Sequence, residues 1–116
     1  MTTPVAKIRS GLEARKEGLP AAAFAIVGDA NDPATWKLPH HTRAILRALK
    51  GRLDIEQTVD WERMAAAVAA LSPGGYRGRR AEAPPEQLLA AARHLAAHYR
   101  AAGRDVPPTL GEILGD

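Results

Sequence analysis

The chain has 116 residues with a formal net charge of +3, and it is 46% hydrophobic but only 4% aromatic. This length supports one hydrophobic core rather than two, so we predict a single domain over residues 1–116. The absence of cysteine excludes disulfides, thiolate metal ligands and a cysteine nucleophile, and no apolar run approaches the roughly 18 residues that cross a bilayer.

The first third of the chain predicts a helix followed by an extended segment. Thr3 and Pro4 are typical of a helix start, and apolar residues then recur at helical spacing, so we expect an N-terminal helix within residues 1–20. Residues 24–27, Phe-Ala-Ile-Val, are strand-like and are followed by turn-forming residues. A lone strand forms no sheet. The segment near residues 22–39 is therefore predicted either as extended chain laid over helices or as half of a small hairpin.

The rest of the chain predicts three helices and a short final turn. Helical periodicity covers residues 41–50, 61–71 and 85–102, and glycine or proline follows each of these segments. Residues 109–116 are expected to add one short turn. The predicted fold class is mostly α, a compact bundle of three to four helices with the extended, strand-like segment described above.

Two groups of basic residues are candidates for an anion-binding or nucleic-acid-binding surface. In the loop 74–80 the glycines let backbone N–H groups approach an oxyanion, and an aromatic ring among the arginines can stack on a base. The lysine and hydroxyl of a P-loop are absent, so nucleotide hydrolysis is not indicated. The other interpretation is a solvated helix face beside a flexible loop. The candidate binding residues are Tyr76, Arg77, Arg79 and Arg80 in the loop, with Arg43, Arg47 and Lys50 as a stripe on the 41–50 helix.

The four histidines form two close pairs, His40 with His41 and His94 with His98. The second pair stands four apart on a predicted helix, so both rings can face one metal ion, and the first pair can supply further ligands. The zincin arrangement needs a glutamate directly after the first histidine, and Leu95 occupies that position. Adjacent residues seldom both ligate one ion, and no carboxylate stands in an obvious completing position. We therefore interpret the imidazoles as scaffold groups that donate hydrogen bonds, predict no cofactor, and keep a histidine-metal site as an alternative.

Trp36 and Trp61 are interpreted as core residues rather than as recognition anchors, because so small a core needs their volume. Ser10 and Ser72 stand in no nucleophile motif, and no pair of acids is placed for glycosidase chemistry. The sequence therefore predicts no catalytic residue and no enzyme activity.

Several of these segments together resemble a small domain of tailed-phage and prophage proteins. They are residues 36–41 (Trp-Lys-Leu-Pro-His-His), Val59-x-Trp61 before an alanine-rich helix, residues 94–99 (His-Leu-Ala-Ala-His-Tyr) and residues 107–108 (Pro-Pro). The family's domain is appended to head maturation (prohead) proteases and other virion-morphogenesis proteins. The resemblance covers residues 33–108 and leaves the N-terminal helix outside it. The serine and histidine arrangement of a prohead protease is missing, so that activity is not implied here.

These observations predict a non-enzymatic phage or prophage accessory module that binds nucleic acid or a phage structural protein through its basic loop and helix face. A protein–protein interaction domain with an apolar contact surface is the second interpretation. A histidine-metal protein, in one version hydrolytic, is the third. We expect no membrane partner and a location in the host cytoplasm or on the virion. The oligomeric state is left open.

Overall fold

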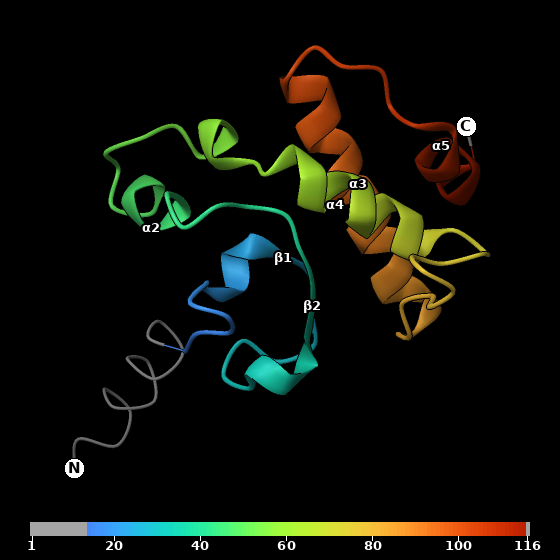
Figure 1. Ribbon diagram of the computed structural model, residues 1–116, viewed down its shortest axis with the longest axis horizontal. Coiled ribbons are helices and arrows are strands. Elements are labelled where there is room, and N and C mark those ends of the chain that lie inside the picture. The colour runs from blue at the N-terminus through green and yellow to red at the C-terminus, as the bar shows by residue number, and fades with distance from the viewer. Residues whose placement is uncertain (1–13, 116) are drawn as a thin grey trace.

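The computed structural model describes residues 14–115, and most of the predicted N-terminal helix lies outside them. Within these residues the regular elements are a two-stranded sheet, four α-helices and short 3-10 turns (Figure 1). The strands are β1 (Phe24–Val27) and β2 (Trp36–Pro39). The helices are α2 (Ile45–Ala48), α3 (Trp61–Leu71), α4 (Pro85–Ala101) and α5 (Pro108–Leu114). The domain is therefore mixed, with helices packed on a small sheet, rather than a pure helix bundle.

The extended segment forms a β-hairpin, the second of the two arrangements expected for it. β1 and β2 are antiparallel, and Ile26 pairs with Lys37. Trp36 is fully buried, and its indole Nε1 donates to the backbone carbonyl of Asp29 at 2.8 Å across the connecting turn. The Phe24 ring packs against the indole with ring centroids 5.4 Å apart. The interpretation of Trp36 as a core residue is confirmed.

Local capping explains where the long helices begin. Asp60 caps α3, because its carboxylate accepts hydrogen bonds from the backbone N–H groups of Glu62 and Arg63. α4 begins at Pro85, where the missing N–H costs nothing in the first turn. The helix predicted over residues 41–50 is shorter than expected, because α2 covers only residues 45–48 and turns flank it.

The sheet packs against the helices on both of its strands. β1 lies against α4, β2 lies against α3, and α5 packs on α3 and α4. The main core lies between these elements, and a second core cluster lies around Trp36 and Ile45. None of the helices in residues 14–115 is long and apolar enough to cross a membrane.

Candidate metal centre

The backbone around His40 and His41 is held on both sides. The chain leaves β2 and runs between residue 23 and the segment before α3. The His40 N–H donates to the carbonyl of Ala23 at 2.9 Å, and the His40 carbonyl accepts from the Asp60 N–H at 2.9 Å. His41 forms an isolated antiparallel bridge with Val59. These contacts fix the direction in which the two rings leave the chain.

His94 and His98 lie one turn apart on α4, and their rings meet those of His40 and His41. One ring nitrogen from each of the four residues lies within 4.8 Å of all the others. The Nε2 atom of His94 is 3.0 Å from Nε2 of His40 and 3.2 Å from Nε2 of His98. His40, His41 and His98 are buried, and His94 is exposed. The four imidazoles thus converge on one point at the edge of the domain.

A hydroxyl determines which nitrogen of His41 carries the proton. Thr58 Oγ1 donates its single hydrogen to the carbonyl of Ile55 at 2.7 Å. The same oxygen lies 2.8 Å from His41 Nδ1, so it accepts a hydrogen bond from Nδ1–H. The neutral ring therefore carries its proton on Nδ1 and a lone pair on Nε2. This Nε2 atom is buried and has no hydrogen-bond partner among the described residues.

His40 and His98 are held in the same way by acceptors on their Nδ1 atoms. The Leu38 carbonyl oxygen lies 3.1 Å from His40 Nδ1, and Glu56 Oε1 lies 2.8 Å from His98 Nδ1. A carbonyl and a carboxylate only accept, so both Nδ1 atoms donate. Leu38 has a left-handed backbone with φ of 64°, which is uncommon for a residue with a side chain. In the neutral form of these three rings, a proton on Nδ1 leaves a lone pair on Nε2.

Hydrogen bonds among the four rings cannot give every Nε2 atom a partner. A neutral His94 has at most one Nε2–H to share between His40 and His98. The lone pair of His41 Nε2 would still have no donor. Several nitrogen lone pairs that face one another at such distances repel unless a cation lies between them. The centre is therefore one that a cation would stabilise electrostatically.

Burial favours the neutral form of His40, His41 and His94. Desolvation by burial lowers the pKa of His40 to about 3, against a hydrogen bond to Leu38 that raises it. Burial also lowers the pKa of His41 to about 4, with the neighbouring rings of His98 and His94 acting in the same direction. The pKa of His94 is lowered as well, mainly because the neighbouring rings desolvate its imidazole although the residue as a whole is exposed. Neutral imidazole is the form that coordinates a metal.

The two separations measured around His94 Nε2 are close to those of a tetrahedral transition-metal site. Zinc–nitrogen bonds of about 2.0–2.1 Å place two tetrahedral ligand atoms about 3.4 Å apart. The separations of 3.0 and 3.2 Å around His94 Nε2 are close to that value. Four ligands from the protein would fill a tetrahedral shell, which is the arrangement of structural zinc sites. The sequence predicts scaffold roles for the two histidine pairs, and the structure brings all four rings together, as the metal alternative requires.

Sequence reasoning missed Glu56 and Thr58 as partners of the histidines. Both lie on a short 3-10 helix, η3 (Ile55–Thr58), whose N-cap Asp54 accepts from the Glu56 N–H at 3.0 Å. No functional role was predicted for this segment from the sequence. No local pattern could link it to α4, because Glu56 and His98 are 42 positions apart.

The two groups of basic residues do not form one surface. The loop residues Tyr76 to Arg80 and the stripe of Arg43, Arg47 and Lys50 are exposed. Figure 1 places α2, which carries the stripe, and the loop after α3 toward opposite ends of the longest axis of the molecule. That axis extends 49 Å. The basic loop and the helix stripe therefore lie on separate parts of the surface.

Trp61 is only half-buried, unlike Trp36. Its ring packs edge-on against Tyr99 with centroids 5.1 Å apart, and the guanidinium of Arg104 lies 3.9 Å from its centroid. Trp61 therefore closes the side of the main core where the chain leaves α4.

Searches of known protein families, of curated proteins and of solved structures found no match to this chain.

Proposed function

We propose that this domain binds one transition-metal ion of the Zn²⁺ class through the Nε2 atoms of His40, His41, His94 and His98. The observation that carries the proposal is the convergence of four ring nitrogens within 4.8 Å of one another. The buried, unpartnered Nε2 of His41 supports it independently, because a buried lone pair without a partner is costly. Four imidazole ligands suit zinc, copper, nickel or cobalt, and a closed tetrahedral set favours zinc.

The ion's role in this proposal is structural. It would join the segment after β2 to α4, and through Thr58 and Glu56 it would also hold η3 in place. The core has few large side chains to do this, since α4 contributes mainly alanines to it. Binding energy at such a site adds directly to the free energy of folding. Because all four tetrahedral positions are taken by side chains, we do not propose the hydrolytic version of a histidine-metal protein.

The expected role as a phage accessory module that binds nucleic acid or a virion protein stays a prediction. A domain stabilised by a bound metal ion would give such a module a rigid support. The apolar-interface alternative has less support, because Leu49 and Tyr76 are the exposed large hydrophobic residues among those described. One follows α2 and the other lies in the loop after α3, so they form no common patch.

The test is a zinc titration of protein without an affinity tag. The chain has only four histidines, so histidine-dependent binding by the tag-free protein reports on this site alone. Protein stripped with a chelator and titrated with Zn²⁺ by calorimetry should bind one equivalent. His41→Gln and His98→Gln should each lose that binding. Arg93→Gln, an exposed change next to His94 on the same helix, should retain it.

Two results would contradict the proposal. One is a wild-type protein that takes up no zinc, copper, nickel or cobalt. The other is zinc uptake that both histidine variants retain in full, because the bound ion would then lie elsewhere.

A further inference from the structure

The loop after α3 is an ordered hairpin rather than a flexible connection. Tyr76 and Arg79 exchange two backbone hydrogen bonds, of 2.9 and 3.0 Å. Between them Arg77 and Gly78 have φ values of 53° and 79°. Positive φ at both central positions is the signature of a type I′ turn, which matches the twist of a β-hairpin. We call residues 75–80 the basic hairpin.

The basic hairpin is anchored to the domain at its base. Gly75 has φ of +70°, and a Cβ there would lie 2.3 Å from the carbonyl carbon of Arg79. Only glycine fits this approach of the two strands. Just past the hairpin, the Ala81 N–H donates to the carbonyl of Ala70 on α3 at 2.8 Å. The arginines are therefore presented from a fixed backbone.

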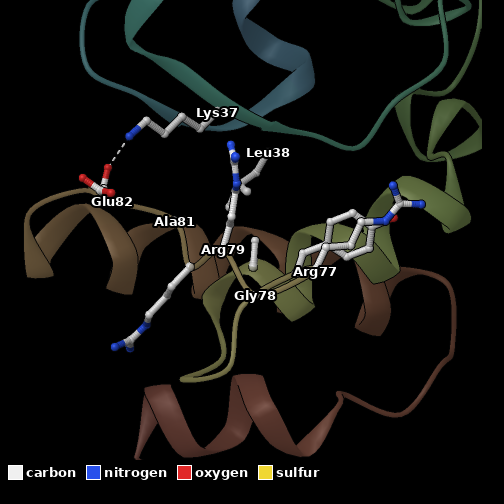
Figure 2. A pocket seen from close by; sticks show the side chains of 10 residues that line it. Lys37, Leu38, Arg77, Gly78, Arg79, Ala81 and Glu82 are labelled. Carbon is white, nitrogen blue, oxygen red and sulfur yellow. Dashed lines mark hydrogen bonds between the residues drawn. The ribbon is translucent and has the colours of Figure 1, made fainter.

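A shallow depression of about 1050 Å³ lies against the basic hairpin (Figure 2). It is lined by residues 76–82 together with Lys37, Leu38 and Ala70. Figure 2 shows the side chain of Arg79 on the same side of the hairpin as Lys37, and Arg77 directed toward the other end of the depression. Lys37 Nζ donates to the backbone carbonyl of Glu82, which holds the lysine at the rim.

Positive charge dominates this depression. Arg77, Arg79, Arg80 and Lys37 line it, and Glu82 is its one acidic residue. In the described part of the chain, no ion pair involves these four cations. Tyr76 is 42% exposed as a residue, and the Arg77 guanidinium lies 5.2 Å from the centroid of its ring. At the tip, a Cβ on Gly78 would meet nothing within 4 Å, so the backbone there is open to a ligand.

We propose that the basic hairpin binds the phosphodiester backbone of nucleic acid. Guanidinium groups pair bidentately with phosphate oxygens, and successive phosphates match several cations set along one open depression. The exposed tyrosine beside them offers a face on which a base can stack. None of the four histidines lines the depression, although Leu38 contributes to both places, and the proposed contact needs no metal chemistry. The proposed site includes Lys37, which was not predicted as a binding residue from the sequence, and it does not include the stripe on α2.

The test compares two double variants that remove equal charge. Binding of a fluorescein-labelled 20-base-pair DNA duplex, and of a single strand of the same sequence, is followed by anisotropy across a salt series. In Arg77→Ala with Arg79→Ala, we expect the dissociation constant to rise about tenfold or more at 0.1 M salt, and the salt slope to fall by about two. The matched control, Arg47→Ala with Lys50→Ala at the α2 end, should stay within about twofold of wild type because these charges lie toward the other end of the molecule and outside the proposed site.

Three results would overturn the assignment. Wild-type protein that binds neither duplex nor single strand at low salt would remove nucleic acid as the ligand. Equal losses in the two double variants would show a response to net charge alone. Displacement of the DNA by polyglutamate at equal charge concentration would favour an acidic protein surface instead. Zinc binding, measured separately, should be the same in wild type and in both double variants.

Discussion

The carboxylate of Glu56 lies 2.8 Å from Nδ1 of His98, although 42 positions separate the two residues. The pair orients the imidazole so that its other nitrogen lies 3.2 Å from His94 Nε2. The His98 side chain is 7% exposed and that of Glu56 is 36% exposed, so the contact lies at the boundary between core and solvent. A carboxylate on the far nitrogen of a metal-binding histidine fixes its tautomer and raises its basicity. Glu56 is therefore a positioning residue of the proposed metal centre.

Replacing this carboxylate should weaken zinc binding without unfolding the domain. In Glu56→Gln the shape is retained but the charge is lost, and we expect zinc affinity to fall about 10- to 100-fold. Competition with a chromophoric chelator measures the change. Glu112→Gln, an exposed acid on α5, is the control and should bind like wild type. Equal affinities for Glu56→Gln and wild type would show that Glu56 does not act on the metal.

The hydroxyl of Thr58 should stabilise the folded state even in metal-free protein. Thr58→Val retains the volume but leaves the buried Nδ1–H of His41 without an acceptor. We expect the free energy of unfolding to fall by about 1–3 kcal/mol in urea denaturation, the usual cost of an unsatisfied buried polar group. Thr42→Val changes an exposed threonine next to the same histidine and should cost much less. Equal losses in the two variants would argue against the Thr58–His41 hydrogen bond.

The exposed ligand should be replaceable by a small molecule, and a buried one should not. His94→Ala removes the one exposed ring of the four, so added imidazole can reach the vacated position. We expect imidazole to restore zinc affinity in His94→Ala in a concentration-dependent way. His98→Ala opens a buried cavity beside Glu56 and should not recover. If imidazole restored zinc affinity in both variants, or in neither, the result would contradict this difference between the two ligands.

Stability of the metal-free protein should decrease as the solution is acidified. Burial lowers the folded-state pKa values of His40 and His41 to about 3 and about 4, below the 6.5 of an unperturbed histidine. Between those limits the unfolded chain binds more protons than the folded chain, so the free energy of unfolding falls as pH falls from about 6.5. The stability is fully present above that pH. Thermal melts from pH 7.5 to 4.5 measure it, and a flat profile would contradict the burial of neutral rings.

Much of the fold followed from local pattern. The apolar spacing predicted α3 to the residue and α4 to within one residue of its end. The 41–50 segment shows where such reasoning fails. Leu49 in this segment is 53% exposed, because α2 makes only one turn and Gly51 at φ +76° redirects the chain. Tertiary packing overrode the helical periodicity there.

The candidate site was predicted only in part, for a physical reason. Helical spacing showed that His94 and His98 share one face of α4. Their meeting with His40 and His41 depends on the packing of the β-hairpin against the helices, which no local pattern specifies. Two adjacent histidines both face the centre because Ala23, Thr58 and Asp60 hold the backbone around them.

X-ray absorption at the zinc edge of the one-to-one complex tests the central claim most directly. Four histidine ligands predict about four nitrogen scatterers near 2.0 Å, with the outer-shell pattern of imidazole rings. The chain has no cysteine, so no sulfur contribution is expected. A six-coordinate shell dominated by oxygen, without imidazole scattering, would show that the ion does not bind where the four rings converge.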